Sequence, residues 1–212
     1  CRETINGLQG SDHLVCEVDV RNEEHLVSLR QLVEKELGNF DVLVNSIGVS
    51  ENYAVIDSGF EAWDNAIQVM LYGAVKACRA LVPLIRDGGR IIHITSIHYE
   101  RVAAGSSAYG MAKAAVTQFC RSLAVELAPG NILSNAIAPG FVSTPMSVKA
   151  YGRNELESTW FRDNYVTGSH LPLQRAGRPE EIAGVAWFLA GPDASYITGS
   201  VITIDGGLTI TF

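Results

Sequence analysis

The stretch "GRIIHITSI" (89–97) decides the fold of this chain. Its apolar residues do not alternate with polar ones, which is typical of a parallel strand that helices cover on both faces. Segments of helical period flank it at 60–85 and 107–129. The alternation continues along the chain, with strands expected at 13–20, 40–49, 132–140 and 200–207 and helices at 23–38 and 179–191. The sequence therefore predicts an α/β fold with a doubly wound, mostly parallel sheet.

Length and composition suit one domain that spans 1–212. Of the 212 residues, 47% are hydrophobic and 18% are charged, which is enough apolar material for a core. No apolar run approaches the roughly 18 residues of a membrane span. The net charge of −7 comes without a basic stripe for phosphates, so we expect neither a membrane nor a nucleic acid as partner. The cysteines form no CxxC pair or Cys/His cluster, which favours a reduced, cytoplasmic protein without a metal site.

A tyrosine and a lysine lie four positions apart in "SAYGMAK" (107–113). On a helix this spacing puts Tyr109 and Lys113 on one face, where the ammonium would lower the pKa of the phenol toward that of a useful acid or base. Ser96 ends the strand before them, at the edge where α/β sheets bind ligands. Chance can produce the Tyr/Lys spacing, and serine ends many strands. Together the three predict proton transfer at a hydroxyl or carbonyl beside a hydride acceptor.

The only long irregular stretch covers 141–178 and is rich in polar and aromatic residues. Long loops at the carboxyl edge of such a sheet often cover a substrate, so we expect a substrate lid here. The alternative is a surface excursion without function.

The motifs resemble those of the short-chain dehydrogenase/reductase family over essentially the whole chain. The similar segments are "CEVDV" (16–20), "VNSIG" (44–48), "APGFVSTP" (138–145) and "GRPEEIAGVAWFLAGPDASYITGSVITIDGG" (177–207). In "VNSIG", Asn45 and Gly48 match the family pattern, while Ser46 and Ile47 depart from it. Ser96, Tyr109 and Lys113 also stand at the family's catalytic spacing. The resemblance implies a Rossmann-like fold and hydride transfer. It makes Tyr109 the general acid/base, Lys113 the ligand of the nicotinamide ribose, and Ser96 the group that positions the substrate oxygen.

The resemblance also implies a site for NAD or NADP. It places Asp19 near the adenine amino group and Val20 beside the adenine ring. Val142 and Thr144 would lie near the nicotinamide carboxamide. The residues assigned to the cofactor are Asp19, Val20, Asn45, Gly48, Tyr109, Lys113, Pro139, Gly140, Val142 and Thr144.

The choice between NAD and NADP rests on the start of the chain. Arg2 would pair with a 2′-phosphate and favour NADP, or it is simply an exposed helix residue. The spacing of Ile5 and Leu8 suits a family helix that an acidic residue precedes, which would favour NAD. We lean to NAD.

Two features depart from the family pattern. Met70 stands where the family usually has an asparagine that helps a water join the lysine to solvent, and a thioether is at best a weak acceptor. A main-chain carbonyl would still hold such a water, so we expect a changed or slowed proton relay. The first two strands and the glycine-rich turn of the family are also absent. We expect this chain to be part of a longer protein.

The loop "IHYER" (97–101) is unusually polar beside a substrate position. With the final strand segment it is similar to glucose 1-dehydrogenases and related sugar or polyol dehydrogenases. His98 would then join Ser96 and Tyr109 at the substrate by bonding a sugar hydroxyl, or it is a solvated loop histidine. The alternatives are a 3-oxoacyl reductase and a non-catalytic, regulatory relative. The resemblance further implies a homotetramer that pairs the helices at 60–85 and 107–129.

Overall fold

The computed structural model describes residues 7–8, 10, 12–49, 53–56, 58–148 and 152–211. Within them, four parallel strands form one sheet in the order β1-β2-β3-β4. The strands are β1 (Phe40–Asn45), β2 (Ile85–Ile94), β3 (Leu133–Pro139) and β4 (Val201–Ile204). The helices are α2 (Glu23–Glu36), α3 (Phe60–Ile67), α4 (Gly73–Leu81), α5 (Ser107–Glu126), α6 (Thr159–Phe161) and α7 (Pro179–Ala190).

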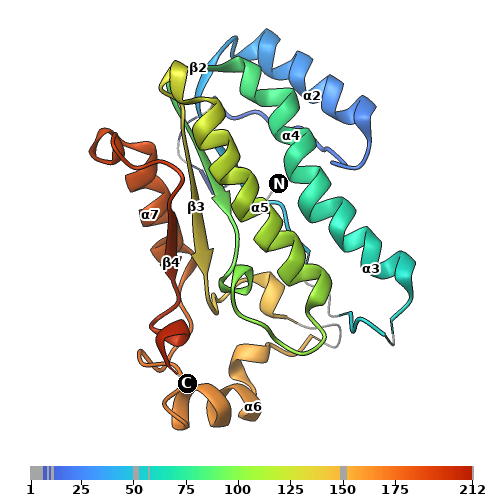
Figure 1. The fold of residues 1–212 in the computed structure, drawn as a ribbon, viewed down its shortest axis with the longest axis vertical. Coiled ribbons are helices and arrows are strands. Elements are labelled where there is room, and N and C mark those ends of the chain that lie inside the picture. The colour runs from blue at the N-terminus through green and yellow to red at the C-terminus, as the bar shows by residue number, and fades with distance from the viewer. Residues whose placement is uncertain are drawn as a thin grey trace.

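Successive residues of β2 point to opposite faces, and helices cover both faces. Ile91 packs in one cluster with Cys78 of α4 and Leu123 of α5. Ile92 packs in another with Leu189 of α7. Figure 1 shows the same arrangement, with α4 and α5 on one side of the sheet and α7 on the other. This confirms the predicted doubly wound α/β fold.

Sequence signals set the ends of α2 and α7. The side chain of Asn22 accepts hydrogen bonds from the backbone N–H groups of Glu24 and His25, which caps the start of α2. Gly38 follows the helix with a φ of 66°. Pro179 opens α7, and Glu181 accepts from the backbone N–H of Arg178.

The long helix predicted at 60–85 is present but not uniform. A π-helical turn (Gln68–Tyr72) joins α3 to α4, and a 3₁₀ turn (Val82–Leu84) follows α4. By length and composition alone, Phe60–Leu84 is apolar enough to cross a membrane, which the sequence analysis did not anticipate. One face of this stretch packs against α5 and α2, and core helices of that kind pass the same test.

Two strand predictions are wrong in part. The segment 13–20 is not a strand, because no described strand lies beside it to pair with its backbone groups. The strand predicted at 40–49 ends at Asn45 and is not buried throughout. Val42 and Val44 are 37% and 49% exposed, because β1 is an edge strand of the described sheet.

The stretch 141–178 holds short helical turns around an aromatic cluster. Phe141 lies 5.0 Å from Phe161 and 4.7 Å from Tyr165 between ring centroids, and Trp160 lies 5.3 Å from Tyr165. Figure 1 shows α6 at the end of the molecule toward which the strand arrows of β2 and β3 point. The stretch thus lies at the carboxyl edge of the sheet.

Candidate active site

The site lies where the carboxyl ends of three strands meet. Asn45 is the last residue of β1, Ser96 follows β2, and Pro139 ends β3. Because the strands are parallel, these residues reach the same edge of the sheet. Figure 1 shows α5 starting at this edge. Tyr109 and Lys113 lie in the first two turns of this helix.

Lys113 is buried and held by two backbone carbonyl groups. Its Nζ donates to the carbonyl oxygen of Ile94 at 3.0 Å and to that of Ile47 at 3.2 Å. The Nζ atom lies 5.7 Å from the centroid of the Tyr109 ring. Burial lowers the pKa of Lys113 to about 8. The predicted pair therefore does share one helix face inside the site.

Tyr109 differs from the expectation in one respect. Burial raises the pKa of its phenol, and a hydrogen bond with Ser96 opposes that rise. Lys113 was expected to lower this pKa, but its ammonium is turned to the carbonyls of Ile47 and Ile94. The structure nonetheless brings Ser96, Tyr109 and Lys113 together as the sequence predicts.

His98 lies against Tyr109. Its ring meets the Tyr109 ring edge to face, with centroids 5.6 Å apart, and its backbone N–H donates to the Ser96 hydroxyl at 3.2 Å. Burial lowers the pKa of His98, which favours the neutral form of its ring. Within the described part of the chain, its Nδ1 is buried without a hydrogen-bond partner. His98 also lines a cavity of about 340 Å³, whose lining does not include Ser96, Tyr109 or Lys113.

The loop after β1 leaves room around Lys113. A Cβ atom on Gly48 would lie 3.5 Å from Lys113 Nζ, so the glycine keeps that space open for a ligand such as a ribose hydroxyl. Asn45 fixes the loop by accepting the N–H of Ile47 at 3.3 Å. These residues fit the nicotinamide end of a dinucleotide.

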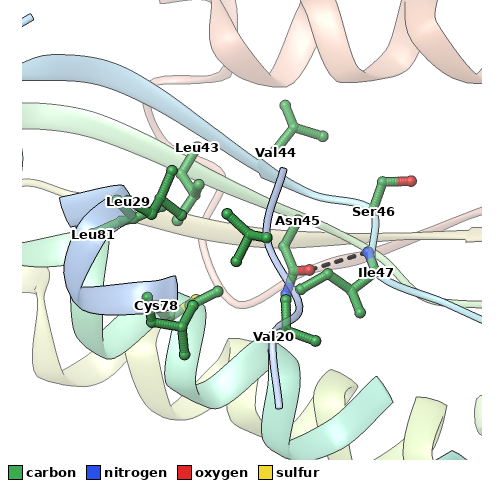
Figure 2. A pocket seen from close by; sticks show the side chains of 12 residues that line it. Val20, Leu29, Leu43, Val44, Asn45, Ser46, Ile47, Cys78 and Leu81 are labelled. Atoms are coloured by element: carbon green, nitrogen blue, oxygen red, sulfur yellow. Dashed lines mark hydrogen bonds between the residues drawn. The ribbon is translucent and has the colours of Figure 1, made fainter. Parts of the chain in front are cut away.

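Of the two residues predicted to bind adenine, Val20 lines a cavity and Asp19 does not. Figure 2 shows Val20, Leu29, Leu43 and Ile47 around an apolar cavity of about 220 Å³. Val20 is seated so closely on α4 that a Cβ on Gly73 would lie 2.5 Å from it. Asp19 is half-buried and paired with Arg21 at 2.8 Å, and this pairing lowers the pKa of the Asp19 carboxyl to about 2.

Other predicted cofactor residues lie beyond β3. Gly140 and Val142 follow Pro139, and Val142 pairs with Gly177 in an isolated bridge. Thr144 is half-buried and precedes a 3₁₀ turn (Pro145–Ser147). Arg2 and Ile5, on which the choice between NAD and NADP rested, lie outside the described residues, as does Cys1.

We expect Gly140→Ala to destabilise the turn beside the site. A Cβ on Gly140 would lie 2.8 Å from the Cβ of Asp205 and 3.0 Å from its Cα, closer than real contacts allow. Asp205 in turn accepts the N–H groups of Gly207 and Thr209. The free energy of unfolding should fall by about 1–3 kcal/mol in a denaturant titration. Gly184→Ala in α7 is the control, because nothing lies within 4 Å of its Cβ position. Equal stability of the two variants would contradict the packing described.

His93 is a residue that the sequence analysis missed. It is fully buried in β2, and its Nδ1 lies 3.1 Å from Asn45 Nδ2. The signal was present, since a histidine interrupts the apolar run "RIIHIT" (90–95).

The fold and the Ser96–Tyr109–Lys113 group define the class of the protein as a Rossmann-like oxidoreductase. A family model described as enoyl-(acyl carrier protein) reductase matches residues 2–209. The chain thus belongs to the short-chain dehydrogenase/reductase family, whose members are NAD(P)-dependent oxidoreductases.

Several relatives are similar over most of this chain. An uncharacterized short-chain type dehydrogenase/reductase of Sinorhizobium fredii is 37% identical over 93% of this chain, which spans 35% of that relative. The 3-oxoacyl acyl-carrier-protein reductase of Thermotoga maritima is 34% identical over 91% of this chain and 76% of its own length. The ligand-free structure of Thermoplasma acidophilum aldohexose dehydrogenase is 31% identical with a TM-score of 0.84, covering 97% of this chain and 81% of that one.

Proposed function

We propose that the protein transfers a hydride between NAD(P) and a small polar alcohol or ketone, namely a sugar or polyol. The observation that carries this proposal is the unpartnered Nδ1 of His98 beside the hydrogen-bonded Ser96 and Tyr109. A polyhydroxylated substrate has a hydroxyl to satisfy that nitrogen in addition to the one that reacts. The similarity to an aldohexose dehydrogenase supports the same substrate class.

The mechanism assigns one task to each residue. Bound NAD(P) supplies the hydride acceptor or donor. The Ser96 hydroxyl hydrogen-bonds the substrate oxygen, and the Tyr109 phenol exchanges a proton with it. Lys113 binds the ribose hydroxyls, and its positive charge favours the phenolate form of Tyr109 once it turns toward the ligand. Asn45, Gly48, Pro139 and Gly140 shape the nicotinamide pocket.

Met70 bears on the speed of proton exchange. It is buried in the π-helical turn among Ala66, Ala108 and Ala112. Its thioether cannot replace an asparagine in holding a water, although π turns leave backbone groups free to do so. We propose a slowed relay between Lys113 and solvent.

For the cofactor we propose NAD in preference to NADP, on the sequence pattern that precedes the described residues. Comparing kcat/KM for NAD and NADP tests this choice.

We propose a cytoplasmic protein, which the free Cys16, Cys78 and Cys120 support. We also propose a homotetramer that uses exposed apolar residues of the long helices, including Met111 and Val125. The stretch 141–178 acts as the substrate lid in this proposal.

A 3-oxoacyl reductase is the second candidate, because similar relatives carry that name. The polar loop 97–101 and the net charge of −7 oppose it, since an acidic carrier would prefer a basic entrance. A non-catalytic relative would explain Met70. The retention of Ser96, Tyr109 and Lys113 in one site opposes that alternative.

We expect His98→Leu to raise KM for D-glucose about tenfold, with a smaller change in kcat. The variant keeps the side-chain bulk but removes the nitrogen that would bond a substrate hydroxyl, which is worth about 1 kcal/mol or slightly more. Initial rates with NAD on D-glucose and sorbitol, and with NADH or NADPH on an acetoacetyl thioester, measure the effect. Val102→Thr, which lines the same cavity and is 96% exposed, is the control. Turnover of the thioester alone would replace the sugar proposal with 3-oxoacyl reduction.

A further inference from the structure

His93, in the centre of the sheet, contacts Asn45 of the candidate active site. His93 is 0% exposed and lies between Asn45 of β1 and Ala136 of β3. Its ring meets that of Phe119 of α5 at 5.8 Å between centroids. Lys113 is the charged group that acts on it, and its neighbours on β1 and β3 carry no charge.

The hydrogen bonds around Asn45 fix the direction of the contact with His93. Asn45 Oδ1 accepts the N–H of Ile47, so its amide nitrogen is the atom that faces His93 Nδ1 at 3.1 Å. An amide nitrogen only donates. His93 is therefore assigned as a neutral acceptor at Nδ1 with its proton on Nε2, which has no hydrogen-bond partner among the described residues. Burial favours this neutral form by lowering the pKa of His93 to about 4.

Two short connections lead from His93 to Lys113. Through Asn45 it fixes Ile47, whose carbonyl oxygen accepts from Lys113 Nζ at 3.2 Å. Along the backbone it precedes Ile94, whose carbonyl oxygen accepts from the same Nζ at 3.0 Å. The Ile47 acceptor of the lysine ammonium thus depends on the place of the buried ring, whereas the Ile94 acceptor belongs to the backbone of β2.

We infer that His93 is a positioning residue, which acts through Asn45 and Ile47 to hold the ammonium of Lys113 in the active site. This inference rests on the roles proposed above for Lys113 and Tyr109. Without an acceptor at Nδ1, the buried Asn45 amide must turn to find another partner. Ile47 then loses its acceptor, and Lys113 loses one of its two carbonyl groups.

Two substitutions of similar size distinguish a positioning role of His93 from a packing role. His93→Asn puts an acceptor oxygen near the place of Nδ1, whereas His93→Gln puts it near the place of Nε2. With a less stabilised ammonium, the pKa of Tyr109 should rise in H93Q and stay unchanged in H93N. Turnover of D-glucose with NAD near neutral pH should fall roughly three- to tenfold in H93Q, as for loss of one hydrogen bond, and stay within about twofold in H93N.

The pKa of Tyr109 is read in the complex with NAD and without substrate, because Lys113 favours the phenolate only once it turns toward the ligand. The ultraviolet absorbance of tyrosinate is titrated in the full chain of each variant, and the same titration with Tyr109→Phe added is subtracted. The pH–rate profile is a second readout. Phe119→Leu, which packs on His93 but forms no hydrogen bond with it, controls for packing and should lower only the melting temperature.

Equal Tyr109 titrations and pH profiles for H93Q, H93N and the natural protein would overturn the inference. A rise in H93N as large as that in H93Q would also overturn it, because the position of the acceptor would then not matter. Failure of the proposed function gives a different result, namely unchanged turnover in Tyr109→Phe alone.

Discussion

Tyr109→Phe should lower kcat by about 10²–10⁴-fold, the range that general acid/base groups contribute. The substitution removes the phenolic oxygen, which bonds Ser96, and keeps the ring that packs against His98. The melting temperature should therefore change little, and the loss should appear in kcat more than in KM. Steady-state rates with NAD and D-glucose measure it.

Tyr196→Phe is the matched control, because Tyr196 is fully exposed and distant in sequence from the site. It should leave kcat unchanged. A Tyr109→Phe enzyme with natural turnover would remove Tyr109 from the mechanism. The non-catalytic alternative would gain only if the natural chain itself showed no turnover.

The second large effect concerns acid stability. The pKa of His93 falls from 6.5 to about 4 on folding, because the buried ring resists protonation. Between these pH values the unfolded chain binds more protons than the folded one, so stability decreases as the pH falls from 6.5 to about 4. The cost reaches about 3 kcal/mol below that window. Because the pKa of Lys113 is about 8, the pH dependence of stability that Lys113 contributes lies at higher pH.

His93→Asn should flatten this dependence, since asparagine does not titrate. Urea titrations at several pH values compare the free energies of unfolding of the two proteins. Phe119→Leu serves again as the control, with lower stability but the natural pH dependence. Parallel curves for H93N and the natural protein would show that His93 takes up its proton without unfolding.

The spacing of apolar residues along the sequence predicts most helices and strands of this fold, but not which strands pair with each other. The helices predicted at 23–38 and 179–191 depend on local signals, and the structure confirms them as α2 and α7. A strand depends on a partner that may be distant in sequence. This is why the apolar segment 13–20 has no ladder and β1 is half exposed.

In the candidate site, too, local sequence predicts some features, whereas others depend on residues distant in the sequence. The spacing of Tyr109 and Lys113 on one helix is local information, and Ser96 follows from the end of a strand. The direction of the Lys113 ammonium depends on carbonyls of Ile47 and Ile94, which lie on other elements. His93 was missed because a histidine in an apolar strand is ordinarily a packing residue, and only its pairing with Asn45 shows otherwise.

Transfer of a labelled hydride tests the central claim most directly. The full chain is incubated with NAD and with aldohexoses or polyols that carry deuterium on their carbinol carbons, and the recovered NADH is analysed by mass spectrometry. We predict that the recovered NADH is heavier than ordinary NADH by one deuterium, and that Tyr109→Phe forms no such product. NADH without deuterium from every sugar and polyol would contradict it.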